Sequence, residues 1–172
     1  MERKNIITFK GNPLTLLGPE LKVGDTAPDF VVADSGLKPV KLSDFRGQTL
    51  IISVVPSLDT PVCETQTKKF NHETGSLNAK ILTISMDLPF AQKRFCDALN
   101  VKNVLVLSDY KDHDFGNKYG LLIKELGLLT RAVLVIGTDG KIAYIEIVRE
   151  VTQEPNYQGA LAKVKSSATA KV

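Results

Sequence analysis

The sequence predicts a mixed α/β fold in which a central sheet carries helices on both faces. Apolar, β-branched runs at 50–55, 81–86 and 104–107 are typical of buried strands. Helical segments at 61–73 and 89–100 separate these runs, and a hairpin and a last helix follow them. Strands that alternate with helices and then end in a hairpin give a mixed sheet.

The N-terminal segment predicts a β-hairpin that closes one end of the core. Short apolar runs at 6–9 and 14–17 flank the turn-rich residues 10–13. Residues 24–30 then introduce a short strand, and 42–47 form a connector that carries one helical turn.

The C-terminal half predicts a short helix, a hairpin and a closing helix. The short helix is expected at 114–119 and leads into a glycine-containing loop. Strands at 132–136 and 142–148 flank Asp139-Gly140, a pair that favours a tight hairpin turn. A helix at about 156–166 closes the chain.

Composition indicates one globular domain over residues 1–172. A chain of 172 residues with 43% hydrophobic content can bury its own core. Its last residues, 166–172, are expected to form a flexible tail. The net charge is only +3 and its lysines and arginines are scattered, so nothing indicates a nucleic-acid partner. We find no apolar run of membrane-spanning length and no secretory signal, which makes the cytoplasm the expected location.

One of the two cysteines falls at the start of a predicted helix. Pro56 ends the strand at 50–55. Thr60 and Pro61 match an N-cap followed by the first helical position, since Pro61 has no N–H to lose there. Cys63 therefore lies in the first helical turn.

This position predicts a reactive thiol. Unpaired backbone N–H groups and the positive end of the helix dipole favour a thiolate over a thiol, and a thiolate is the nucleophilic form of cysteine. Thr60 can direct its hydroxyl toward the sulfur, while the two prolines Pro56 and Pro61 fix the loop. By position alone, however, Cys63 could equally be a small buried hydrophobic residue.

The residues around Cys63 resemble a known family. The spacing P-x-x-x-T-x-x-C, filled by Pro56, Thr60 and Cys63, is similar to the active-site motif of the peroxiredoxins. Further matching segments resemble the bacterial thiol peroxidases, which are atypical two-cysteine peroxiredoxins, and together they span roughly residues 5–165: Ser57–Cys63, Met86–Gln92, Arg94–Cys96, Arg131–Val133 and Glu154–Tyr157.

The resemblance implies a thioredoxin-like fold and a thiol-dependent hydroperoxide reductase that needs no metal or organic cofactor. It implies that Cys63 is the peroxidatic cysteine, that Cys96 resolves its sulfenic acid as an intrachain Cys63–Cys96 disulfide, and that Arg131 reaches the thiolate. A second thiol is chemically useful because sulfenic acid over-oxidises irreversibly unless a thiol condenses with it. The implied partners are a hydroperoxide, thioredoxin as reductant, and a second copy of the chain in a homodimer.

Less specific interpretations of these residues stay open on the sequence alone. Cys96 lies mid-helix among apolar residues, as a core thiol does, and Arg131 precedes a strand, as a solvated arginine often does. A dithiol–disulfide oxidoreductase needs a C-x-x-C pair, but position 66 is Gln66. His72 and His113 are not spaced with the cysteines as zinc ligands. A non-enzymatic binding or holdase domain with inert cysteines is the main alternative.

Overall fold

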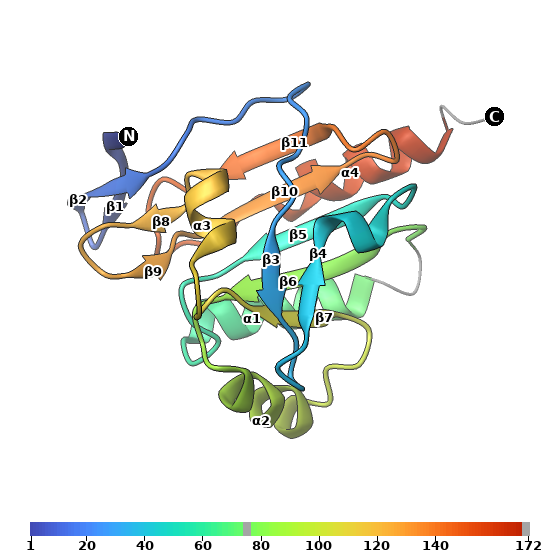
Figure 1. The fold of residues 1–172 in the computed structure, drawn as a ribbon, viewed down its shortest axis with the longest axis horizontal. Helices are drawn as coiled ribbons and strands as arrows, with labels where there is room; N and C mark the ends of the chain where they lie inside the picture. Colours follow the sequence, from blue (N-terminus) through green and yellow to red (C-terminus); the bar gives the residue numbers. More distant parts are fainter. Residues whose placement is uncertain (74–76, 170–172) are drawn as a thin grey trace.

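The computed structural model (Figure 1) describes residues 1–73 and 77–169, with side chains as far as 166. Its strands are β1 (Glu2–Phe9), β2 (Asn12–Leu17), β3 (Val31–Ala33), β4 (Pro39–Lys41), β5 (Leu50–Val54), β6 (Lys80–Ser85), β7 (Leu105–Ser108), β8 (Leu122–Ile123), β9 (Leu128–Leu129), β10 (Ala132–Ile136) and β11 (Ile142–Ile147). Its helices are the 3₁₀ helix η1 (Leu42–Phe45) and the α-helices α1 (Pro61–Glu73), α2 (Pro89–Leu99), α3 (Asp114–Tyr119) and α4 (Tyr157–Thr169).

The main sheet is mixed, as predicted. Its seven strands lie in the order β11-β10-β5-β6-β7-β3-β4. The central strands β5, β6 and β7 are parallel, whereas β10 pairs antiparallel with both β5 and β11. The hairpin predicted around Asp139-Gly140 is therefore β10–β11, at one edge of the sheet.

Helices cover both faces of this sheet, which explains why its central strands are apolar throughout. Along β5 the side chains alternate, so that Ile52 packs with Phe115 of α3 while Ile51 packs with Phe70 of α1 and Leu161 of α4. Figure 1 accordingly shows α3 in front of the sheet, with α1 and α4 behind it. The thioredoxin-like arrangement is confirmed.

A second, four-stranded antiparallel sheet was not predicted. The N-terminal hairpin is present as β1–β2, with the turn at Lys10 and Gly11. However, β8 and β9 lie in the segment expected to be a loop, and they extend the hairpin to the order β1-β2-β8-β9. The two-residue strands β8 and β9 are too short to show an alternation of apolar and polar residues in the sequence. The three-residue strand β4 was not predicted for the same reason. Ile7, Leu16 and Ile123, from three strands of this sheet, are buried together in a small hydrophobic cluster.

The C-terminal tail is shorter than expected. Helix α4 continues to Thr169, so residues 166–169 are helical and that part of the predicted tail is wrong. Residues 170–172 lie outside the described part of the chain. Within the described residues, no helix is long and apolar enough to cross a membrane.

Glu150, just after β11, forms hydrogen bonds with the N-terminal hairpin β1–β2. This carboxylate accepts hydrogen bonds from the Thr8 hydroxyl at 2.7 Å and from the backbone N–H groups of Lys10 at 2.9 Å and Gly11 at 3.0 Å. These bonds, with the hydroxyl of Thr8 first among them, lower the pKa of Glu150 to about 2.

The lowered pKa predicts a pH-dependent contribution to stability. Because the folded state holds the ionised form, the stabilisation is complete above the unfolded pKa of about 4.3 and is lost as the pH falls toward about 2. Glu150→Gln should lower the melting temperature at pH 7, because it replaces an ionised acceptor with a neutral one. Melting curves recorded from pH 7 to pH 2 should show the two proteins converging below pH 4; a constant difference would contradict the assignment.

Candidate active site

The structure places Cys63 in the first turn of α1, fully buried, with an exposed fraction of 0%. Thr60 caps this helix: its carbonyl accepts the Glu64 N–H at 3.0 Å and its Oγ1 accepts the Cys63 N–H at 3.4 Å. The predicted N-cap and first helical position are thus confirmed. The Thr60 hydroxyl also donates to the Ser57 carbonyl at 3.4 Å, as a side chain that caps a helix commonly bonds to nearby backbone groups.

Arg131 meets the sulfur from the neighbouring strand. It immediately precedes β10, whose Ala132 lies opposite Val54 at the end of β5, and this pairing brings Arg131 to the start of α1. Its Nη2 donates to Cys63 Sγ at 3.2 Å. The guanidinium is only 2% exposed, so the interpretation as a solvated strand-end arginine is wrong.

Two further bonds hold the guanidinium in place. Nε donates to the Val151 carbonyl at 2.8 Å, and Nη1 donates to Gln66 Oε1 at 2.9 Å. Gln66 is itself held, because its Nε2 donates to Ser53 Oγ at 2.7 Å. The orientation of Arg131 is therefore fixed on three sides before any substrate arrives.

The positive charge of Arg131 lies against the sulfur of Cys63. Among the described residues no carboxylate pairs with Arg131, so its buried positive charge lacks an ordinary counterion. A buried charge without a partner is costly. The side chains that this charge contacts are those of Gln66 and Cys63, and Cys63 lies in the first turn of α1.

Gln66 and Ser53 were not expected as site residues. The expectation for Gln66 was only that it breaks a C-x-x-C pair. Two signals were available: Cys63 and Gln66 are three residues apart and so share a helix face, and Ser53 interrupts an otherwise apolar buried strand.

Cys96 lies on α2, half-buried, and both cysteines are free thiols. Burial, and secondarily the carboxylate of Asp97, raises the pKa of Cys96 above its ordinary value. Cys96 is therefore protonated at neutral pH, which makes it a poorer nucleophile than an ionised cysteine.

A cleft of about 330 Å³ separates the start of α1 from α2. Its lining residues come from both sides: Leu58, Asp59, Glu64, Asp87, Ala91, Arg94, Phe95, Ala98 and Leu99. Cys96 is absent from this lining and packs against the core cluster that contains Cys63. The structure brings Arg131, Thr60 and Cys63 together but leaves Cys96 on a separate helix.

Within the described residues, no group of three or more histidine, cysteine, aspartate or glutamate side chains is arranged to hold a metal ion. A thioredoxin-like sheet with a buried cysteine at a helix N-terminus and an arginine against its sulfur defines a thiol-based redox protein.

Comparison with known proteins narrows this class. The Redoxin family model matches residues 22–161. A thiol peroxidase of Oceanobacillus iheyensis is 54% identical over 91% of this chain and 96% of its own length. A thiol peroxidase of Streptococcus pneumoniae is 49% identical over 94% of this chain and 99% of its own length.

Solved structures agree. A peroxiredoxin-like protein from Aquifex aeolicus superposes with a TM-score of 0.89 at 48% identity, covering 96% of this chain and 97% of that one. A thiol peroxidase from Chromobacterium violaceum has a TM-score of 0.86 at 19% identity, covering 96% and 98%, and shows the shared fold. The chain belongs to the Redoxin family and, within it, to the thiol peroxidases, so its activity is that of a thiol-dependent peroxidase.

Proposed function

We propose that the protein reduces hydrogen peroxide and organic hydroperoxides through a sulfenic acid on Cys63. The thiolate attacks the terminal oxygen of the hydroperoxide and the O–O bond breaks. The hydroxyl is transferred to sulfur, and the leaving oxygen takes a proton from solvent to depart as water or an alcohol. The contact of Arg131 Nη2 with Cys63 Sγ at 3.2 Å in a buried site carries this proposal.

The other expected residues have distinct parts in this step. Arg131 stabilises the thiolate and offers its remaining N–H groups to the breaking O–O bond. Thr60 starts the helix that presents the sulfur, and Pro56, which is buried after β5, directs the chain into that helix. No metal or organic cofactor is needed for the step.

We propose that Cys96 then condenses with the sulfenic acid, releasing water and forming the Cys63–Cys96 disulfide. Cys96 is the one other cysteine in the sequence, and its raised pKa keeps it from competing for peroxide. A dithiol protein, thioredoxin, reopens the bond and is itself oxidised. We also propose that the protein acts in the cytoplasm, because both cysteines are free thiols and thiols are kept reduced in that compartment.

Disulfide formation requires at least one of the two cysteine-bearing helices to open. A disulfide brings its Cα atoms to about 4.4–6.8 Å. Cys63 is enclosed in the first turn of α1, whereas Cys96 lies on α2 and does not face the cleft between the helices. The start of α1, α2 or both must therefore unwind after oxidation and reform after reduction.

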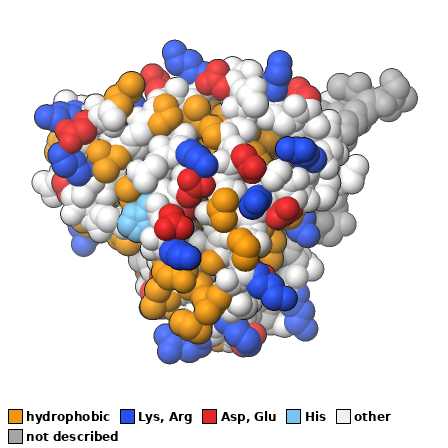
Figure 2. All heavy atoms as spheres, viewed as in Figure 1, with side chains coloured by type: hydrophobic (Ala, Val, Ile, Leu, Met, Phe, Trp, Pro, Cys, Tyr) orange, Lys and Arg blue, Asp and Glu red, His pale blue; other side chains and the backbone are white. Residues whose placement is uncertain are grey.

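We further propose that residues 1–172 act as one domain and that two copies form a homodimer. Large exposed apolar side chains support the homodimer, because such residues often mark protein–protein interfaces. They include Leu37 (50% exposed), Leu88 (52%) and Phe90 (67%). Figure 2 shows hydrophobic side chains gathered over α2 and the nearby β3–β4 turn, while acidic and basic side chains are interspersed elsewhere on that face.

The rate of thiol loss tests the proposed activity. One equivalent of hydrogen peroxide added to the reduced protein should consume both thiols together, far faster than it consumes free cysteine, with a disulfide as product. Thiol counting and mass spectrometry measure this. A rate equal to that of free cysteine would favour the alternative of a non-enzymatic binding or holdase domain with inert cysteines.

A further inference from the structure

The carboxylate of Asp87 joins the loop before α1 to the segment that starts α2. Asp87 lies between β6 and α2. Its Oδ1 accepts the Ser57 hydroxyl at 2.8 Å, and its Oδ2 accepts the Leu58 N–H at 2.7 Å. Both donors belong to the loop that leads into the helix of Cys63.

The same carboxylate is connected to the interior of α2. Its Oδ2 also accepts the Ser85 hydroxyl at 2.7 Å. Gln92 Nε2, in α2, donates to that Ser85 oxygen at 3.0 Å and to the Leu107 carbonyl of β7 at 2.7 Å. Gln92 is 1% exposed, and its Oε1 is buried without a hydrogen-bond partner.

A continuous chain of hydrogen bonds therefore runs from Ser57 through Asp87 and Ser85 to Gln92. We propose that Asp87 is a positioning residue that makes the start of α1 and α2 open together, and thereby sets how often oxidised Cys63 forms a disulfide instead of over-oxidising. This inference rests on the proposed sulfenic acid and disulfide. The inference adds that Asp87 controls the ratio of disulfide formation to over-oxidation of Cys63.

The physical reason is the location of the bonds. Asp87 touches neither Cys63 nor Arg131, so losing its carboxylate leaves the folded site able to react with peroxide. The loss does remove an ionised acceptor from Ser57 and Leu58, and such bonds are the strong ones. The open form should become roughly tenfold more populated. Disulfide formation, which needs the open form, should then outcompete a second attack by peroxide.

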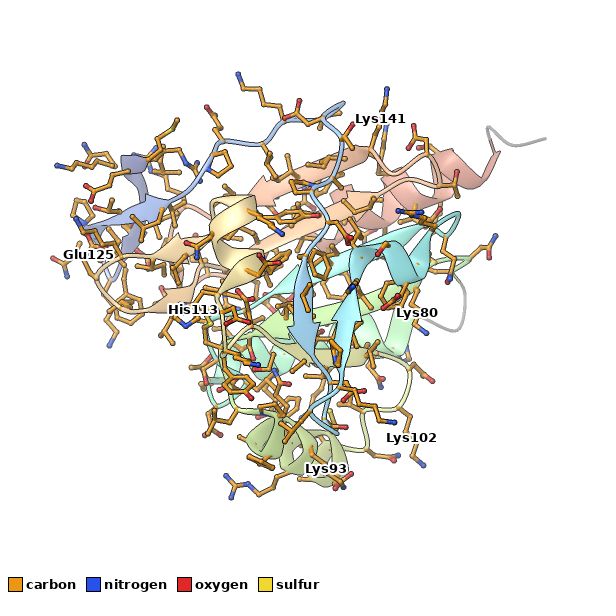
Figure 3. The ribbon with its side chains drawn as sticks, in the orientation of Figure 1. Lys80, Lys93, Lys102, His113, Glu125 and Lys141 are labelled. Carbon is orange, nitrogen blue, oxygen red and sulfur yellow. The ribbon has the colours of Figure 1, made fainter. Side chains whose placement is uncertain are left out.

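Hydrogen exchange of the reduced protein tests the coupling without any peroxide. In Asp87→Asn, amides of 57–66 and of 89–99 should exchange about tenfold faster, by a similar factor, while β5, β6 and β10 stay protected. Ser57→Ala, which removes one bond and keeps the carboxylate, should give a smaller change in the same two segments. Glu125→Gln is the matched control, because Glu125 also binds a distant backbone N–H, that of Thr15, at 2.9 Å. Figure 3 shows Glu125 at the left edge of the molecule, away from Lys93 of α2 at the bottom.

Over-oxidation gives the second readout. With excess peroxide, the fraction of Cys63 carried to sulfinic acid should fall about tenfold in Asp87→Asn and stay unchanged in Glu125→Gln, by mass spectrometry. Unchanged exchange, faster exchange in one segment alone, or loss of protection in the strands as well would overturn the role of Asp87. Coupled exchange together with neither a disulfide nor added oxygen on wild-type Cys63 would instead overturn the proposed function.

Discussion

Replacing Cys96 with serine is expected to permit one round of peroxide reduction and then to stop turnover. The variant keeps the Cys63 thiolate and its Arg131 contact, so the sulfenic acid still forms. It lacks the thiol that condenses with that acid, so excess peroxide carries the sulfur to sulfinic acid. Mass spectrometry should therefore show one and then two oxygens added to Cys63, whereas the wild-type protein loses two hydrogens on forming a disulfide.

Replacing Cys63 with serine is the matched variant and should abolish the activity outright. The serine hydroxyl is not ionised at neutral pH, and the remaining Cys96 is half-buried with a raised pKa. Its mass should stay unchanged under one equivalent of peroxide. Normal turnover of Cys96→Ser with thioredoxin would remove Cys96 from the proposed mechanism, and oxygen added to Cys96 in Cys63→Ser would reverse the two roles.

The long elements of the fold could be predicted because each carries its own local signal. The apolar run that begins at Leu50 became β5, and Thr60-Pro61 marked the start of α1 at Pro61. The small sheet could not be predicted in full, because β8 and β9 exist through pairing with the hairpin and not through their own two-residue patterns.

The candidate site divides in the same way. The position of Cys63 at the start of a helix could be predicted from its neighbouring residues. The position of Arg131 beside Cys63 depends on the pairing of β10 with β5, which no local sequence pattern contains. Its contact with the sulfur was expected from the resemblance to peroxiredoxins alone. Gln66 was missed as a site residue because its partners, Arg131 and Ser53, are distant in sequence.

Replacing Arg131 with methionine should slow the reaction of Cys63 with peroxide by roughly 10²–10³-fold, the usual cost of losing a donor aimed at a reacting oxygen. Methionine keeps most of the bulk and removes the charge. Without that charge the sulfur loses the contact at 3.2 Å, and the alkylation of Cys63 at pH 7 should also become slower. Stopped-flow thiol loss and the alkylation rate at pH 7 measure the two effects.

Two further variants separate charge from folding. Arg131→Lys keeps the charge but not the fork that binds Gln66 Oε1 and the Val151 carbonyl. Its peroxide and alkylation rates should therefore lie between those of the wild-type protein and of Arg131→Met. Arg46→Met, at an exposed arginine just after η1, should change neither rate. If Arg131→Met, folded as judged by its melting curve, kept both wild-type rates, the buried arginine would have no part in the chemistry of Cys63.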